Sequence, residues 1–238
     1  MFMKPLLSLI QFSTILPLGK TQDLEPFARH SYLYPLAGYL IGGIAALAVF
    51  FITDPAIAAA VAIAGLLLLT GAHHFDGLLD LGDALMAHGD REKRIRALTD
   101  IHIGAGGVAL GIAVTVLLFA GLQASSSVVC ALITGEVCAK FSMAFLTAYG
   151  TPFRQGIHSY LHQFSHTYYP VLAAILCIPL ILLPVSPVKL AGAFVMMILC
   201  PTILLLISRN LFGGVNGDVV GASNEITRAC VIIVMVLI

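Results

Sequence analysis

The sequence predicts an all-α fold, a polytopic transmembrane helical bundle of about seven spans. Of its 238 residues, 59% are hydrophobic and only 10% are Asp, Glu, Lys or Arg, against about 25% charged residues in an ordinary soluble domain. The apolar residues form long segments, and most charged residues lie between them. A soluble core of this size cannot hide so much apolar surface, whereas a lipid bilayer solvates it. We therefore expect residues 1–238 to form a single integral membrane domain.

Seven segments are apolar enough to be candidate spans, because a spanning helix needs roughly 20 mostly apolar residues. The first contains Gly38 and Gly42, a G-x-x-x-G spacing that lets two helices approach closely. We interpret these two as packing glycines, and the sequence leaves a homo-oligomer open. The segments are 33–52, 56–72, 105–123, 128–148, 168–185, 189–208 and 219–238.

The basic residues predict the orientation. If the N-terminus is cytoplasmic, ten Lys and Arg residues are cytoplasmic, Lys189 alone lies on the far side, and Lys140 lies within a span. This positive-inside bias predicts a multi-pass protein of the cell membrane with its N-terminus in the cytoplasm. The ten are Lys4, Lys20, Arg29, Arg91, Lys93, Arg94, Arg96, Arg154, Arg209 and Arg228.

The acidic residues gather on the same side, although acids contribute little to the positive-inside rule. Among the loops, the far side retains only Asp54. A site on the cytoplasmic face, built from residues 73–104, 149–167 and 209–228, explains this clustering. The formal net charge is zero, and a nucleic-acid surface needs a basic patch, so we expect no nucleic-acid partner. The clustered acids are Asp76, Asp80, Asp83, Asp90, Glu92, Asp100, Asp218 and Glu225.

The first acidic motif lies in residues 73–83. Asp76, Asp80 and Asp83 stand at i, i+4 and i+7, so on a helix they share an arc of about 60°. Three carboxylates on one strip repel each other unless a cation lies between them. Magnesium (Mg²⁺) takes oxygen ligands, keeps waters and accepts phosphate oxygens. We favour a metal–phosphate site over a solvated acidic face, because the strip directly follows a span.

The second motif lies in residues 213–225. Its glycines, Gly217 and Gly221 among them, suit a turn or a close approach of backbone to substrate. Asp218 and Glu225 are seven residues apart and share a helix face. They are candidates for the same metal cluster. The alternative is a glycine-rich turn in which Asp218 is the N-cap of the last helix.

Basic residues on the same side are candidates for holding phosphates. Arg91, Lys93 and Arg94 form one cluster, and Arg154 follows in a later loop. Arginine suits bidentate contact with phosphate. The cluster is equally typical of a topology determinant. Asp100 precedes the third span and is expected either to cap it or to bind metal.

Other polar residues have simpler interpretations. His158, His162 and His166 repeat every four residues, which we interpret as a wet helix face rather than a transition-metal site. Glu136 and Lys140 stand at i and i+4 within a span. We favour a neutralised intramembrane pair over a role in binding a polar substrate.

Together these motifs resemble those of the cobalamin synthase family, adenosylcobinamide-GDP ribazoletransferase. The resemblance covers nearly the whole chain in order, with His102 standing where the family has arginine. The family block H-x-D-G-L-x-D-x-x-D is matched by His74, Asp76, Gly77, Leu78, Asp80 and Asp83. Later family glycine and acidic positions are matched by Asp100, Ile103, Gly104, Gly107, Gly214, Gly217, Asp218, Gly221, Ala222 and Glu225.

The resemblance implies a membrane-bound, magnesium-dependent phosphotransferase. It would join adenosylcobinamide-GDP to α-ribazole, or to α-ribazole 5′-phosphate, and release GMP in cobalamin biosynthesis. Magnesium would be held by Asp76, Asp80 and Asp83, with Asp218 and Glu225 as further ligands. A carboxylate such as Asp80 or Asp83, or else His74, would accept the hydroxyl proton.

Two other functions fit parts of the pattern. A CDP-alcohol phosphatidyltransferase also uses aspartates on membrane helices, but its signature has Ala-Arg where this chain has Leu79 and Asp80. A cation-coupled transporter usually binds near the membrane midplane and often shows inverted repeats. Here the acids gather at one surface.

Overall fold

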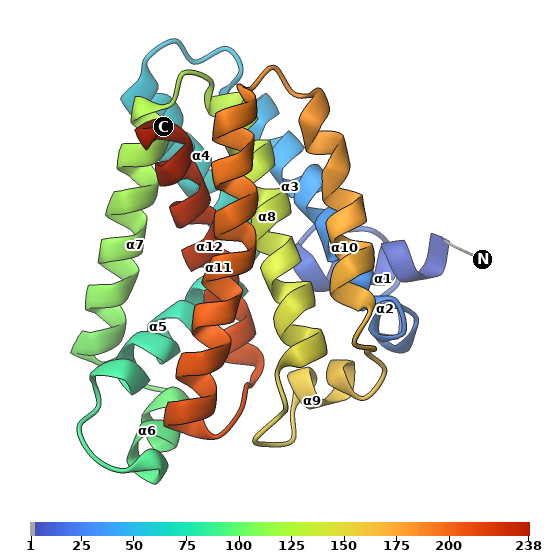
Figure 1. The fold of residues 1–238 in the computed structure, drawn as a ribbon, viewed down its shortest axis with the longest axis vertical. Helices are drawn as coiled ribbons and strands as arrows, with labels where there is room; N and C mark the ends of the chain where they lie inside the picture. The colour runs from blue at the N-terminus through green and yellow to red at the C-terminus, as the bar shows by residue number, and fades with distance from the viewer. Residues whose placement is uncertain (1–2) are drawn as a thin grey trace.

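The computed structural model describes residues 3–238, and these form a helical bundle without a β-sheet (Figure 1). The predicted all-α class is confirmed. The α-helices are α1 (Met3–Ser13), α2 (Glu25–Ala28), α3 (Tyr34–Val49), α4 (Pro55–Leu69), α5 (His73–Met86), α6 (Arg91–Leu98), α7 (Ala105–Ala124), α8 (Val128–Tyr149), α9 (Ile157–His162), α10 (Tyr169–Cys177), α11 (Pro187–Phe212) and α12 (Gly217–Leu237). Two 3₁₀ helices, η1 (Ser31–Leu33) and η2 (Ile178–Leu182), precede α3 and follow α10.

Five helices of the described chain are long and apolar enough to cross a membrane: α3 with η1, α7, α8, α11 and α12. A sixth span results if α4 and α5, which meet at 95°, are counted together. The apolar segment Tyr169–Leu182 is shorter. The chain is therefore a multi-pass membrane protein, while the number seven stays a prediction.

The predicted span 56–72 ends early, at Leu69. Gly71 and Ala72 both adopt left-handed conformations, with φ of 61° and 56°. A left-handed pair cannot continue a right-handed helix, so the chain turns sharply there. The turn sends α5, which carries the first acidic motif, across the end of the bundle instead of along it (Figure 1).

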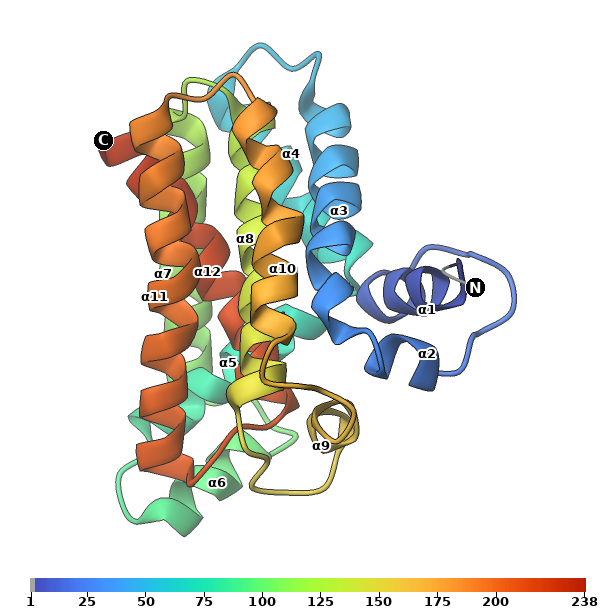
Figure 2. The ribbon, with the colours of Figure 1, turned by 45° about the vertical axis from the view of Figure 1, so that its right-hand side comes forward.

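Helix α8 lies at the centre of the bundle and packs against α3, α10, α11 and α12 (Figures 1 and 2). The G-x-x-x-G face of α3 meets it directly. A Cβ at Gly38 would lie 2.7 Å from Val137 Cα, and one at Gly42 would lie 3.0 Å from Ile133 Cα. The interpretation as packing glycines is confirmed, because this face is covered by α8 of the same chain.

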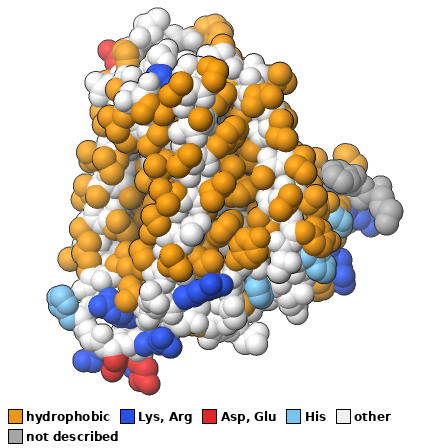
Figure 3. Space-filling model, viewed as in Figure 1, with side chains coloured by type: hydrophobic (Ala, Val, Ile, Leu, Met, Phe, Trp, Pro, Cys, Tyr) orange, Lys and Arg blue, Asp and Glu red, His pale blue; other side chains and the backbone are white. Residues whose placement is uncertain are grey.

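The outer surface of the bundle is apolar. Figure 3 shows a belt of hydrophobic side chains along its length, with charged side chains concentrated at its lower end. Exposed apolar residues on the long outer helices include Ile112, Val116, Val195, Ile203 and Leu206. Such a belt is what a helix bundle presents to lipid tails.

The charged end of the bundle is formed by α5, α6, α9 and the connection between α11 and α12 (Figure 2). A short parallel bridge joins two of its loops, since Pro152 pairs with Val215 and Val215 N donates to Thr151 O at 2.9 Å. The structure thus brings the three predicted site stretches, 73–104, 149–167 and 209–228, toward one end.

Candidate functional site

The two acidic motifs meet where α5 crosses α12. A Cβ at Gly77 would lie 2.6 Å from Asp218 O, and one at Gly221 would lie 3.3 Å from His74 Cα. Glycine at position 77 therefore permits a contact that a larger residue would prevent. The crossing makes Asp218 the first electrostatic neighbour of Asp80, followed by Asp76 and Asp83. Four of the five predicted metal ligands thus form one acidic cluster.

Asp83 has a second role in this cluster. Its carboxylate accepts hydrogen bonds from Gly104 N at 2.7 Å and Gly107 N at 2.8 Å. These are backbone donors at the start of α7, whose own N-cap residue, Gly104, offers no side chain. A carboxylate suits this position because the first N–H groups of a helix lack partners and carry partial positive charge.

Asp100 does not cap α7, although that was one of its two expected roles. Its carboxylate instead accepts from the backbone N of His102 at 3.0 Å and lies 2.9 Å from His102 Nδ1. These hydrogen bonds hold the pKa of the exposed Asp100 carboxyl below its usual range. Asp100 and His102 thus form an exposed local turn.

The start of α12 differs from the alternative interpretation, in which Asp218 was the N-cap. The cap is Asn216, whose Oδ1 accepts from Val219 N at 3.1 Å. The same side chain donates from Nδ2 to Asp218 Oδ2 at 2.6 Å. Asp218 lies in the first turn, where the exposed Arg154 is an attractive electrostatic neighbour. The bridged loops thus carry a basic residue to the edge of the acidic cluster.

Glu225 lies apart from this cluster, contrary to its expected role as a metal ligand. It is buried within the bundle and forms an ion pair with Arg228. Arg228 also contacts Glu136 on α8 at 2.5 Å. A buried carboxylate needs a cation close by, and Arg228 stands one helical turn away. Arg228 itself was expected on the cytoplasmic side, and it is buried for the same reason.

A second part of the same polar network contains His74 and Lys140. Lys140 Nζ lies 2.9 Å from Asn224 Oδ1 and 3.4 Å from His74 Nε2. Asn224 Nδ2 in turn donates to Glu225 Oε1 at 3.1 Å. His74 therefore faces α8 and the bundle interior rather than the aspartate strip. The expected pairing of Glu136 with Lys140 is replaced by separate partners for each.

The predicted phosphate-binding residues have different positions. Arg94 donates to Ala84 O at 3.1 Å and to Leu85 O at 2.9 Å, so it satisfies carbonyl groups at the end of α5. Arg91 is exposed and approaches Asn210 O at 3.5 Å. Lys93 is exposed as well. Of the four basic residues predicted to bind phosphate, Arg91, Lys93 and Arg154 thus lie exposed at this end.

Two histidines of the predicted stripe, His158 and His162, lie on α9 and face the end of α8 instead of forming a wet face. His158 Nε2 lies 2.8 Å from Gly150 O, and His162 Nδ1 lies 2.8 Å from Thr147 O. Both rings therefore satisfy carbonyl groups at the end of α8. Burial lowers the pKa of His158 to about 4, which keeps the ring neutral. Helical spacing alone gave no signal for this capping role.

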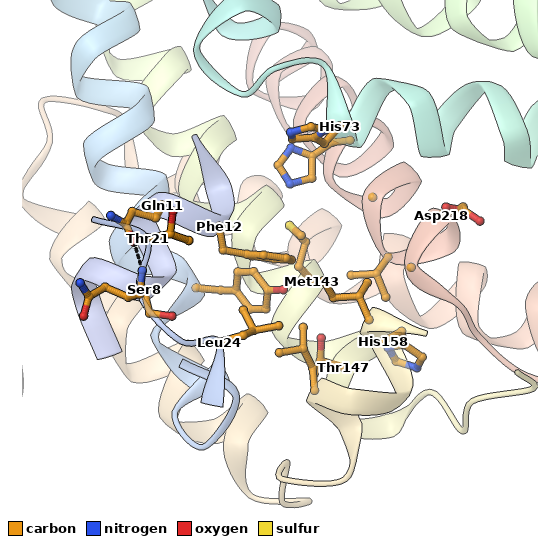
Figure 4. A pocket seen from close by; sticks show the side chains of 18 residues that line it. Ser8, Gln11, Phe12, Thr21, Leu24, His73, Met143, Thr147, His158 and Asp218 are labelled. Carbon is orange, nitrogen blue, oxygen red and sulfur yellow. Dashed lines mark hydrogen bonds between the residues drawn. The ribbon is translucent and has the colours of Figure 1, made fainter. Parts of the chain in front are cut away.

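A cavity of about 550 Å³ opens beside the acidic cluster (Figure 4). It lies between α1 and the ends of α5, α8, α9 and α12, and both Gly217 and Gly221 line it. The sequence did not predict this cavity, because α1 and the loop after it complete its wall and reach the ends of the other helices only through the tertiary fold. Other lining residues are Phe12, Tyr34, His74, Met143, His158 and Asp218.

The fold and this site define a multi-pass membrane protein with an acidic cluster and an adjoining cavity at one end of its bundle. The family model described as cobalamin-5-phosphate synthase matches residues 5–236. The chain belongs to that family. The match favours the predicted family over the two alternatives, a CDP-alcohol phosphatidyltransferase and a transporter.

Relatives named adenosylcobinamide-GDP ribazoletransferase are identical to this chain at about a third of the aligned residues. The protein of Methanocella arvoryzae is 34% identical, covering 95% of this chain and 92% of the relative. That of Methanococcoides burtonii is 30% identical, covering 98% and 92%. That of Archaeoglobus fulgidus is 35% identical, covering 95% and 94%. No solved structure matches the chain significantly.

Proposed function

We propose that this protein transfers a phosphoryl-linked cobinamide from adenosylcobinamide-GDP to α-ribazole or its 5′-phosphate and releases GMP. The proposal rests on one observation above all. In a chain of the cobalamin-5-phosphate synthase family, the crossing of α5 and α12 brings Asp76, Asp80 and Asp218 together beside a cavity. Splitting a diphosphate requires charge neutralisation on the bridging and leaving oxygens.

The donor set of the cluster fits magnesium. The four carboxylates offer oxygen atoms only, and the repulsion among them favours a bound cation. Within residues 3–238 no three His, Cys, Asp or Glu side chains converge closely enough to hold an ion by themselves. Magnesium typically takes one or two protein carboxylates and completes its shell with water and substrate phosphates. We assign Asp80 and Asp76 as its first ligands, with Asp218 beside them.

Bound magnesium would stabilise negative charge on the diphosphate. Side chains of the protein would orient the phosphate, position the helices and accept the proton. Arg154, at the edge of the cluster, is suited to orient a phosphate by bidentate contact. Asp83 fixes the position of α5 against α7 through its two hydrogen bonds. A carboxylate of the cluster accepts the proton of the attacking ribose hydroxyl.

The distribution of charged residues supports a proposed orientation in the membrane. Asp54 caps the start of α4 and Lys189 lies in the first turn of α11. Both helices begin at the end opposite α6 (Figure 1), while charged side chains concentrate at the end with the site (Figure 3). By the positive-inside rule we propose that the site faces the cytoplasm and that the bundle lies in the cell membrane.

The test is GMP release by the purified protein in detergent, given adenosylcobinamide-GDP with or without α-ribazole. We expect release that requires ribazole and forms a cobamide product. Release of GMP without a ribazole requirement would indicate a hydrolase. The absence of release by folded protein would contradict the proposal.

A further inference from the structure

The cavity beside the acidic cluster has chemically different ends. Phe12, Leu24 and Leu161 supply apolar side chains from α1, the loop before α2, and α9. Asp218 from α12 lies on another side of the cavity, well separated from Leu24 in Figure 4. A volume of about 550 Å³ suits a ligand of nucleoside size with an apolar face and a polar tail.

His74 carries an unpartnered hydrogen-bond donor beside this cavity. The ammonium group of Lys140 has only donors, so His74 Nε2, 3.4 Å away, must accept. A neutral imidazole whose Nε2 accepts carries its hydrogen on Nδ1. That Nδ1 is buried and has no partner among residues 3–238. His74 is 94% buried, since its exposed fraction is 6%, and it lines the cavity.

The surrounding charges keep His74 neutral. Glu136, Glu225, Lys140 and Arg228 are all buried, and as two anions and two cations they sum to zero. A proton on His74 would add a positive charge with no counter-ion, and uncompensated buried charge is costly. The single N–H of His74 is therefore a fixed feature of the cavity wall.

His158 offers the opposite group. Its Nε2 donates to Gly150 O at 2.8 Å, so its Nδ1 carries a lone pair. This Nδ1 is also buried and lacks a partner within the described chain. His158 is 97% buried, with an exposed fraction of 3%, and it lines the cavity too. His74 and His158 thus bring one unpartnered donor and one unpartnered acceptor to the wall of the cavity, both just beneath its accessible surface.

We propose that this cavity binds the nucleoside acceptor and that His74 and His158 recognise its two ends. The inference rests on the proposed function. A benzimidazole-type base has one unsubstituted ring nitrogen, which accepts from His74 Nδ1–H, and its apolar rings suit the side of Phe12. A ribose hydroxyl donates to His158 Nδ1. His74 is then a binding residue, because its accepting nitrogen is held by Lys140, and the proton acceptor is a carboxylate.

The test compares α-ribazole with the matching α-riboside of 5,6-dimethylindole, in which a C–H replaces the accepting nitrogen. Both keep the ribose hydroxyls, so both remain acceptors in the GMP-release assay. We expect the wild-type KM to rise about tenfold for the indole compound, with little change in kcat, because one buried hydrogen bond is lost. His74→Phe should give the same high KM for both compounds. His73→Phe changes another side chain of the same cavity and should keep the tenfold preference, because His73 does not hold the donor.

Equal KM values for the two compounds with the wild-type protein would overturn the inference, even if His74→Phe failed to fold. A tenfold preference that survives in folded His74→Phe would overturn it as well. Either result leaves ribazole-dependent GMP release intact, and with it the proposed function. Failure of the wild-type protein to use ribazole at all would overturn both.

Discussion

Gly77 lies against the backbone of Asp218, and a Cβ at position 77 would stand only 2.6 Å from Asp218 O. The contact joins residues that are far apart in the sequence, one on each of two helices. It determines how closely α5 and α12 cross, and so how closely Asp80 approaches Asp218. The geometry of the acidic cluster thus depends on the absence of a side chain at position 77.

Gly77→Ala should therefore separate the two helices. Backbone cannot yield to the added methyl group, so we expect a destabilisation of about 1–3 kcal/mol and a loss of activity larger than the loss of stability explains. Gly43→Ala on α3 is the matched control, because a Cβ there meets nothing within 4 Å. Thermal unfolding in detergent and GMP release are the measurements. Full activity in Gly77→Ala would show that the crossing is not required.

Arg228 holds the buried network together, since it contacts both Glu136 and Glu225. Arg228→Met leaves two carboxylates buried without their cation, which typically costs about 3–5 kcal/mol. We expect little folded protein, measured as monodisperse yield after size-exclusion chromatography. Adding Glu136→Gln and Glu225→Gln should restore part of the yield. A single Arg228→Met variant that folds normally would contradict this role.

The stability of the polar end should depend on pH through His158. Burial lowers the pKa of its ring from 6.5 to about 4, so between these values the unfolded chain binds more protons than the folded one. The contribution that neutral His158 makes to the free energy of unfolding is fully present above about pH 6.5. It is lost as the pH falls toward 4.

His158→Gln tests this pH dependence, because an amide still donates to Gly150 O but does not titrate. Between pH 7.5 and 5 we expect the wild-type Tm to fall by several degrees more than the Tm of His158→Gln. Parallel curves for the two proteins would show that another group causes the pH dependence.

The fold class could be predicted because a membrane span needs a long apolar segment, and such segments are visible locally. The clustering of acids at one end could also be predicted, because the apolar segments determine on which side each loop lies. The turn that ends α4 was not predicted, although Gly71 and the polar sequence after it were a partial signal. The mean hydropathy of residues 56–72 does not reveal that Gly71 and Ala72 adopt left-handed conformations.

Partners within the site could not be predicted, because they come from distant segments. Spacing placed Asp83 on the acidic strip correctly but did not reveal that the start of α7 binds its carboxylate. The spacing likewise predicted that Glu225 joins Asp218 in the metal cluster. In the structure Glu225 instead forms an ion pair with Arg228, three residues further along α12. Helical periodicity predicts which residues share a face of a helix. The residues that contact this face depend on the tertiary packing.

Asp80→Asn tests most directly whether the acidic cluster performs magnesium-dependent phosphoryl transfer. Asp54→Asn is the matched control, because Asp54 caps α4 away from the site and Asn caps equally well. We predict that magnesium removal abolishes GMP release by the wild-type protein. Asp80→Asn should lower release at least about 100-fold at saturating magnesium, while it folds normally and Asp54→Asn stays fully active. Normal release by Asp80→Asn, or by wild-type protein without divalent cations, would contradict the account.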